Sequence, residues 1–182
     1  MMSTNEILDE KNKTLHVICD EVTFPTKKEE RKKINEMIEY LTISQNEKLA
    51  EQYNLRPGMG LAAPQVGITK RFFVIVEEQE DKTFKNYIVF NPKIISNSEE
   101  IIYAGSGEGC LSVNREVDGI VPRHARVTVE YQDENGILTQ TRAREELSIA
   151  FQHEIDHLNG ILFTDKIDSK NPFKNRDKMR EI

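Results

Sequence analysis

Apolar residues in the first third of the chain recur at the spacing of a helix. Three of them form one predicted buried stripe: Ile34, Ile38 and Leu41. Just upstream, Thr26 and Glu29 make a T-x-x-E pattern, which is typical of a helix start because each side chain satisfies a free backbone N–H. The pattern predicts a helix that begins near residue 27 and extends, alone or as a helix pair, to about residue 53.

The middle of the chain carries short runs of β-branched and aromatic residues, which are typical of strands. A stretch punctuated by glycine and proline comes first, at residues 54–67, and predicts an irregular loop. The predicted strands then cover residues 71–77, 87–90, a short run near 94, 100–104, 126–132 and 137–143. Apolar and polar residues alternate strictly in the run 126–132, and the turn sequence DENG that follows it indicates a hairpin.

A second helix is predicted over residues 145–159, with Gly160 at its C-terminal stop. A helix, mostly antiparallel strands and a final helix place the fold in the α+β class. The 182 residues contain no internal repeat and no linker rich in glycine, serine or proline, so we expect one domain spanning residues 1–182. Residues from about 169 to 182 are expected to form a loosely attached charged tail.

Composition and charge narrow the classes of function. The net charge is −6, which argues against a general nucleic-acid or anionic-membrane surface. No stretch approaches the roughly 20 apolar residues of a membrane span, and the polar, charged N-terminus does not match a signal peptide. Two cysteines cannot build a disulfide framework. We therefore expect a cytoplasmic protein without a membrane partner.

The clearest chemical motif is H-E-x-x-H, formed by His153, Glu154 and His157. Two histidines four residues apart lie on one face of a helix, so both imidazoles can bind a single metal ion. Glu154 follows the first histidine and is placed to hold a water molecule without binding the metal itself. On a helical wheel all three lie on a flank of the apolar face. Because a buried glutamate is rare unless it is paired or functional, this placement favours a metal site over ordinary core histidines.

The histidine pair leaves a metal site incomplete, because a catalytic site takes a third protein ligand and keeps one open position. One extended motif would supply a third histidine three residues after Gly160, but Phe163 stands there. The charged tail offers only weak carboxylate candidates, Asp177 and Glu181. The other candidate ligands are His16, His124, Cys19 and Cys110. Cys110 is the best of them, since its flanking glycines let the backbone approach another element closely.

Three segments together resemble the peptide deformylase family. They are GMGLAAPQ at residues 58–65, EGCLS at 108–112 and QHEIDHLNG at 152–160. They match that family's G-x-G-x-A-A-P-Q, E-G-C-L-S and Q-H-E-x-D-H-L-x-G motifs at every fixed position and in the same order. The long helix before the first motif and the valine after the second are similar to the longer bacterial form of the enzyme.

The resemblance implies mostly antiparallel strands packed around a central metal-binding helix, and a metal-dependent hydrolase. Its reaction would remove the N-formyl group from the initiator methionine of nascent polypeptides and release formate. The implied metal ligands are Cys110, His153 and His157, and Glu154 is the implied general base. The implied oxyanion donors are the Gln65 side-chain amide and the Leu111 backbone N–H. Spacing and ligand type alone favour zinc, whereas the family implies one divalent ion that is natively Fe(II), with zinc, nickel or cobalt as alternatives.

The sequence indicates the substrate-binding residues less clearly than the metal ligands. We expect Gly60 to permit close backbone pairing with an extended peptide, and Met59, Ile149 and Ala150 to line an apolar pocket for methionine. Glu108 is expected to anchor its loop through an ion pair, with the partner left open between two arginines, Arg56 and Arg123. Contact with the ribosome would require a local basic patch, such as the lysines and arginines of the tail.

Two alternative functions remain open at this point. An H-E-x-x-H metalloprotease would cleave internal peptide bonds and take its third ligand elsewhere than Cys110. A non-catalytic metal-binding or ribosome-docking protein descended from the enzyme would have no need of Glu154 or Gln65, so the presence of both residues argues against it.

Overall fold

The structure, a computed structural model, describes residues 2–182. The α-helices of this part of the chain are α1 (Lys28–Ser44), α2 (Glu47–Tyr53) and α3 (Glu145–Leu158). One sheet has the order β1-β2-β3-β6-β7, with β1 (Gly60–Ala62), β2 (Phe72–Glu78), β3 (Phe84–Asn97), β6 (Arg126–Gln132) and β7 (Leu138–Arg144), all antiparallel. A second sheet has the order β5-β4-β8, with β4 (Ile101–Tyr103), β5 (Arg123–His124) and β8 (Arg180–Glu181).

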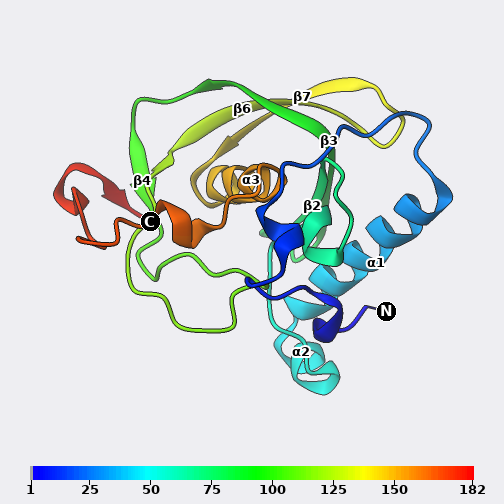
Figure 1. Ribbon diagram of the computed structural model, residues 1–182, viewed down its shortest axis with the longest axis horizontal. Coiled ribbons are helices and arrows are strands. Elements are labelled where there is room, and N and C mark those ends of the chain that lie inside the picture. The colour runs from blue at the N-terminus through cyan, green and yellow to red at the C-terminus, as the bar shows by residue number, and fades with distance from the viewer. Residues whose placement is uncertain (1) are drawn as a thin grey trace.

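Helix α3 occupies the centre of the molecule, with β3, β6 and β7 curving over one side of it (Figure 1). It contacts both ends of the larger sheet, β1 and β7, and also β5 of the smaller sheet. Phe151 is fully buried and packs edge-to-face against Phe73 and Tyr87, with ring centroids 5.7 and 5.5 Å apart. The expectation of an α+β fold built around a central helix is confirmed.

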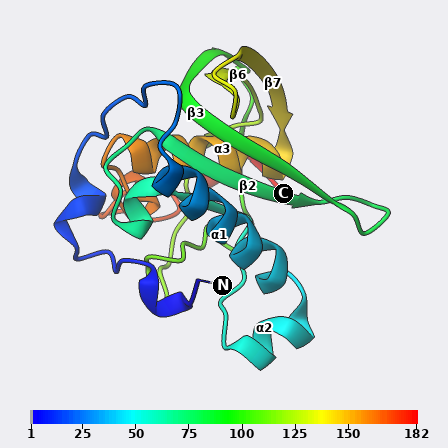
Figure 2. The same ribbon diagram turned by 90° about the vertical axis from the view of Figure 1, so that its right-hand side faces the viewer.

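Helix α1 lies along β2 on the side of the sheet away from α3, and α2 continues from it (Figure 2). Its apolar stripe is buried at Ile34 and Leu41, as the periodicity predicts. The N-cap is Lys27, whose N–H donates to the Glu30 side chain at 2.8 Å, so the predicted cap at Thr26 is wrong by one residue. The Thr26 hydroxyl instead accepts a hydrogen bond from Arg31 at 3.2 Å.

Two strand predictions differ from the structure. The runs predicted at 87–90 and near 94 belong to one strand, β3, whose pairing with β6 shifts register twice. Such irregularities bend a strand without ending it, so a gap in the apolar pattern need not mark a turn. The segment 54–67, predicted as an irregular loop, contains β1 and the 3₁₀ turn Ala63–Val66.

The segment 176–182 is held more firmly than a loosely attached tail. Strand β8 pairs in parallel with β4, and the 3₁₀ turn Arg176–Lys178 precedes it. Arg176 and Arg180 both form ion pairs with glutamates. The pattern of this segment did not predict a strand because it contains too few apolar residues. Its attachment comes instead from backbone pairing with β4 and from the ion pairs of its arginines.

Within residues 2–182, no helix is long and apolar enough to cross a membrane.

The burial of Phe151 generates a stability prediction. Phe151→Ala should lower the free energy of unfolding by about 3–5 kcal/mol, because it leaves a cavity between α3 and the sheet. Leu138→Ala is the control, because Leu138 is 64% exposed and a surface truncation changes stability by about 0.5 kcal/mol or less. Urea denaturation of both variants measures the difference, and equal midpoints would show that α3 is not packed as described.

Candidate active site

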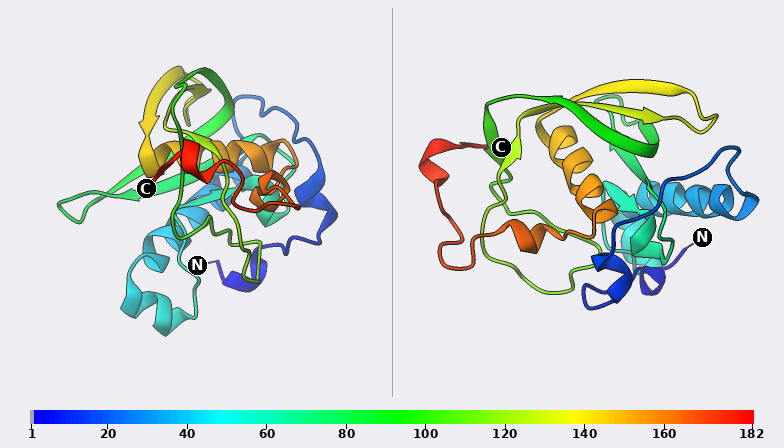
Figure 3. Two further views of the ribbon diagram at one scale, coloured as in Figure 1. Left: turned by 90° about the vertical axis from the view of Figure 1, so that its left-hand side faces the viewer. Right: turned by 45° about the horizontal axis from the view of Figure 1, so that its top comes forward.

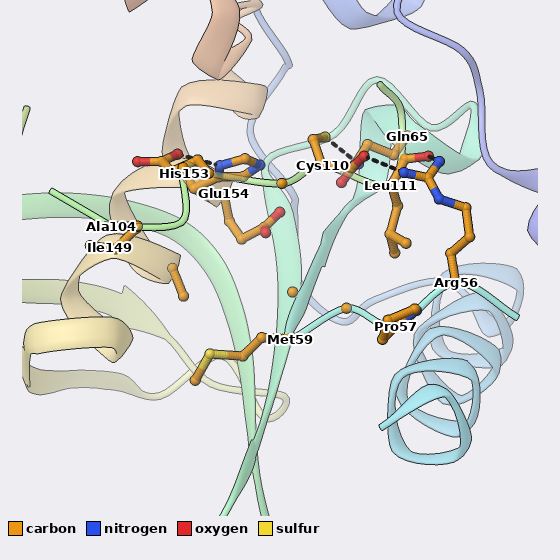
Figure 4. Close-up of a pocket in the computed structure, with 16 residues that line it drawn as sticks. Arg56, Pro57, Met59, Gln65, Ala104, Cys110, Leu111, Ile149, His153 and Glu154 are labelled. Atoms are coloured by element: carbon orange, nitrogen blue, oxygen red, sulfur yellow. Dashed lines mark hydrogen bonds and ion pairs between the residues drawn. The ribbon is translucent and has the colours of Figure 1, made fainter. Parts of the chain in front are cut away.

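The residues singled out from the sequence gather around one cavity of about 350 Å³. Its walls come from α3, from the segment that leads into β1, and from the loop after β4 (Figure 4). Nine of the ten predicted site residues line it: Met59, Gly60, Gln65, Cys110, Leu111, Ile149, Ala150, His153 and Glu154. The tenth, His157, lies one turn further along α3 and is 1% exposed.

Helix α3 and the loop of Cys110 bring three metal-binding side chains together. The ring centroids of His153 and His157 lie 4.9 Å apart, and the Cys110 Sγ is 3.3 Å from His157 Nε2. One donor atom from each of the three side chains lies within 4.8 Å of the other two. This is the one such buried group found within residues 2–182.

The donor set suits a single divalent ion. Thiolate and imidazole ligands lie about 2.0–2.3 Å from a zinc-like ion, so the separation of Sγ and Nε2 agrees with two donors sharing one ion. Three protein donors leave a position open, as a catalytic site requires. The Cys110–His153–His157 cluster is therefore a site for one metal ion, and its donor types admit more than one transition metal.

Arg56 holds the loop that carries Cys110. Its guanidinium donates to the carbonyl oxygens of Cys110 and Leu111, both at 3.1 Å, and of Val113 at 3.0 Å. The Asn114 side chain accepts a fourth, short hydrogen bond. Because one planar cation satisfies several outward carbonyls, the loop keeps its curvature and presents the Cys110 thiol toward α3.

A buried chain of charges ties the same loop to α3. Glu108 accepts from Arg123 Nε and Nη2 at 2.7 and 2.9 Å, and its Oε2 lies 2.9 Å from His153 Nδ1. Arg123 Nη1 donates to Asp156 at 2.6 Å. An acceptor at Nδ1 fixes the His153 tautomer, so Nε2 stays free to face the ion. The expected anchor of Glu108 is therefore present, and its partner is Arg123 rather than Arg56.

The surroundings shift the pKa values of two glutamates, Glu108 and Glu154, in opposite directions. Burial acts to raise the pKa of Glu108, but the hydrogen bonds from Arg123 and His153 outweigh it and hold that pKa near 2. Burial raises the pKa of Glu154 to about 7, against the opposing charges of His153 and Arg123. Glu154 is 3% exposed, and its Oε2 has no hydrogen-bond partner among residues 2–182. One carboxyl is thus a fixed anion and the other can exchange a proton near neutral pH.

Two residues that line the cavity, Gln65 and Leu111, carry hydrogen-bond donors. The Gln65 Oε1 accepts from the Ala62 N–H at 2.8 Å, which turns Nε2 toward Cys110 Sγ at 3.5 Å and Ser112 Oγ at 3.1 Å. Leu111 lines the cavity, and its backbone N–H makes no hydrogen bond to any residue that the structure describes. An unpaired backbone donor beside a cavity is available to a ligand.

Gly60 leaves room for the Glu154 carboxylate. A Cβ at this position would stand 2.3 Å from Glu154 Oε1, well inside van der Waals contact. The glycine therefore lets β1 lie directly against the carboxylate of Glu154. This is a second reason for a glycine here, beside the predicted pairing of its backbone with an extended peptide.

Pattern analysis missed two residues that support the site, Asp156 and Ser112. It left Arg123 as one of two candidate partners of Glu108, because nothing in the pattern of its short strand shows that this arginine is only 2% exposed. Phe163, which excluded a third histidine, stacks on the His153 ring at a centroid distance of 6.1 Å. The unused candidates lie elsewhere: the His16 ring bonds the Glu10 carbonyl, the His124 ring bonds the Ser98 carbonyl, and Cys19 packs in the core beside α3.

The family follows from comparison with known proteins. The model of the polypeptide deformylase family matches residues 4–173. This chain belongs to the peptide deformylase family. Peptide deformylase 2 of Bacillus anthracis is 46% identical over 173 residues, which are 95% of this chain and 94% of that protein. The peptide deformylase of Listeria welshimeri is 47% identical over 94% of each chain.

Solved structures of the family share the fold. A probable peptide deformylase from Synechococcus phage S-SSM7 has a TM-score of 0.73 and 36% identity, covering 88% of this chain and 97% of its own. The peptide deformylase from Thermus thermophilus also has a TM-score of 0.73, with 32% identity over 91% of this chain and 86% of its own.

The metalloprotease alternative is not favoured. A metalloprotease of that kind would take its third metal ligand from another residue, whereas here Cys110 joins His153 and His157.

The buried charge network yields a matched pair of variants. Arg123–Glu108 and Arg115–Glu10 use the same two-pronged geometry, but the Arg123 side chain is 1% exposed and that of Arg115 is 55% exposed. Arg123→Met should cost about 3–5 kcal/mol of unfolding free energy, because Glu108 is left buried without its arginine and Asp156 keeps only the partly exposed Lys166. Arg115→Met should cost about 1 kcal/mol or less.

Metal affinity provides a second readout for the same pair. We expect Arg123→Met to weaken binding about 10–100-fold, since it releases the carboxylate that orients His153. Competition with a chelator, followed by metal analysis, measures the change. Equal affinity in both variants would contradict a role for Arg123 in orienting the ligands.

Proposed function

We propose that this protein is a metal-dependent deformylase that removes the N-formyl group from N-formylmethionyl peptides and releases formate. The observation that carries the proposal is the meeting, in one cavity, of a complete Cys-His-His donor set and a buried, unpaired glutamate. Family membership gives this arrangement its reaction class. The substrates proposed are the initiator ends of nascent polypeptides, and the setting proposed is the cytoplasm.

The metal is proposed to be one ferrous ion held by Cys110, His153 and His157, with zinc, nickel or cobalt able to replace it. A divalent ion in this position supplies a Lewis acid, which makes water acidic near neutral pH and polarises a carbonyl oxygen. The thiolate and imidazole donors accept all four metals, so the donor set supports the proposal without selecting iron.

Glu154 is proposed to move the proton. Its carboxylate accepts a proton from the attacking water and then returns it to the amine as the formyl C–N bond breaks. A pKa near 7 suits both directions of transfer at neutral pH. Burial and the absence of a competing partner for Oε2 keep the proton between Glu154 and the reactants.

Gln65 and Leu111 are proposed to stabilise the oxyanion. The Gln65 amide is fixed at both ends, by Ala62 at its oxygen and by Ser112 at its nitrogen, so its donor direction is set before substrate arrives. The Leu111 N–H is unpaired, and Arg56 holds its carbonyl. Removing one such prearranged donor typically costs about 3–4 kcal/mol of transition-state stabilisation.

The substrate is proposed to lie along β1. This strand is at the edge of its sheet, and Met59 and Gly60 line the cavity beside it. An extended peptide can add to such an edge through its backbone. Met59, Ile149 and Ala150 offer apolar surface to the methionine side chain. A class I type b peptide deformylase from Acinetobacter baumannii, 28% identical with a TM-score of 0.69, has been solved with Met-Ala-Ser bound.

Transient contact with the ribosome is proposed through a local basic patch in residues 169–182. Arg176 and Arg180 are already paired with glutamates, and Lys174 is paired with Asp168 at 2.8 Å. The contact would therefore depend on Lys170 and Lys178, for which the described residues provide no ion pair. Ribosome pelleting of Lys170→Ala and Lys178→Ala variants tests this without disturbing the fold.

The reaction is tested with anaerobically iron-loaded protein and formyl-Met-Ala-Ser. We expect release of formate and Met-Ala-Ser in equal amounts, measured by a coupled formate assay and mass spectrometry. Unformylated longer peptides should remain intact. Fully metallated protein that releases no formate would overturn the proposed function.

Replacing the base separates metal binding from turnover. Glu154→Gln should keep one metal ion per chain and lower kcat by a factor of about 10²–10⁴, since general base catalysis contributes that much. Cys110→Ala should instead lose metal affinity together with activity. Metal analysis and the formate assay on both variants distinguish the two roles, and normal turnover in Glu154→Gln would remove the mechanism.

Oxygen provides a check on the metal. The iron-loaded protein should lose activity in air, because the ferrous ion or the Cys110 thiolate is oxidised. The zinc-loaded protein should keep its activity under the same exposure, apart from slower oxidation of the thiol. The measurement is formate release against time in air, with mass spectrometry of the Cys110 peptide. Identical decay of both forms would argue against a ferrous site.

A further inference from the structure

The segment 176–182 lies beside β4, more than seventy residues away in sequence, at the end of the molecule where α3 begins (Figure 3). Strand β8 pairs with Ile102 and Tyr103 of β4. Two further backbone hydrogen bonds extend this pairing, from the Ile182 N–H to the Tyr103 carbonyl at 3.0 Å and from the Gly105 N–H to the Ile182 carbonyl at 2.9 Å. The pairing therefore fixes the backbone on both sides of Ala104, which lines the cavity.

Arg180 links this segment to the start of α3. Its two terminal nitrogens donate to the Glu145 carboxylate at 2.7 and 2.8 Å, and its Nε donates to Glu100 at 2.8 Å. Glu145 is the first residue of α3 and has a positive φ of 55°. Arg180 thus holds together the first turn of α3, which leads to Ile149, and the strand that leads to Ala104.

Ile182 lies behind the apolar wall of the cavity. Its side chain packs, together with Ala104, against a small cluster formed by Ile102, Ala125 and Ile149. Ile149 and Ala104 also line the cavity, where they lie close to each other at the end away from Arg56 (Figure 4). Ile182 therefore shares one small apolar cluster with two residues of the cavity wall, and it does not line the cavity itself.

Gly105 makes the close approach of the segment feasible. A Cβ there would lie 2.5 Å from Glu181 Oε1. Glu181 is in turn held by the Tyr103 hydroxyl at 2.6 Å and by Arg176 at 2.8 Å. The side chains and backbone of the segment are thus fitted to β4, and the attachment is specific.

We propose that Arg180 and Ile182 are positioning residues for the methionine pocket, acting through Ile149 and Ala104. This inference rests on the proposed function, because it concerns the recognition of methionine in that reaction. A flexible apolar side chain gains binding energy from a preformed wall and loses it when the wall moves. The metal donors and Glu154 are held separately, by Arg56 and by the Arg123 network. Changes in this segment should therefore affect substrate affinity more than they affect the rate of the chemical step.

The test compares Ile182→Ala with Ile182→Leu and with a control, Ile137→Ala, in the iron-loaded protein. The control makes the same truncation at an isoleucine that is 62% exposed and does not line the cavity. For formyl-Met-Ala-Ser we expect Ile182→Ala to raise KM about fivefold, as small changes in an apolar pocket do, and to change kcat less than about twofold. The preference for formyl-Met over formyl-Ala peptides should fall by a similar factor. Ile182→Leu should restore most of both values, and Ile137→Ala should match the parent protein.

A second variant tests the ionic link. Arg180→Gln should raise KM in the same direction, with metal content and thermal unfolding measured beside each assay. Unchanged KM and unchanged peptide preference in both Ile182→Ala and Arg180→Gln would overturn the inference. So would a parallel loss of kcat and metal, which would show a general structural effect. If the parent protein itself releases no formate, the proposed function fails, and that result is distinct from a parent that is active and variants that do not differ.

Discussion

The site depends on one buried cation. Arg123 lies between Glu108 of the cysteine loop and Asp156 of α3, and without it two carboxylates would be buried in the same small volume. Isolated buried carboxylates are costly, so the loop and the helix are stable side by side only when the guanidinium joins them. The same Glu108 orients His153, and Cys110 is two residues further along. The ionic contact that holds the loop therefore also sets the geometry of the donors.

The helical part of the metal site could be predicted from the sequence, because its residues are defined by spacing, whereas Gln65 and Leu111 were indicated only by the family resemblance. The histidines and Glu154 share one helical face by periodicity alone, and few cysteines and histidines competed for the third position. The support of the centre was harder to predict. Glu108 had two arginines as candidate partners, and only the path of the chain between β4 and β5 brings Arg123 to it rather than Arg56. Arg56 binds carbonyl oxygens, which leave no trace in a sequence.

The fold was predictable where amphipathic patterns are long and strong, as in α1, α3 and the β6–β7 hairpin. It was not predictable where backbone pairing alone defines an element. Strand β1 has only three residues, and β8 consists of two charged residues, so neither is long enough to show an apolar pattern. The cap of α1 shifted by one residue because Arg31 competes for the Thr26 hydroxyl. For β1 and β8 a partner strand distant in the sequence outweighed the local preference, whereas at the cap of α1 the competing group is a side chain of the same helix.

The shortness of β1 limits how much of a bound chain the protein can recognise. The strand has three residues, and the N–H of the last one, Ala62, is already occupied by Gln65. Few backbone groups remain at this edge, so in the proposed binding mode only the first residues of an incoming chain would pair with it. Recognition of that kind is independent of the rest of the chain, and it suits a protein that must handle many different sequences sharing the same beginning. The same shortness leaves little free edge for two copies to join strand to strand.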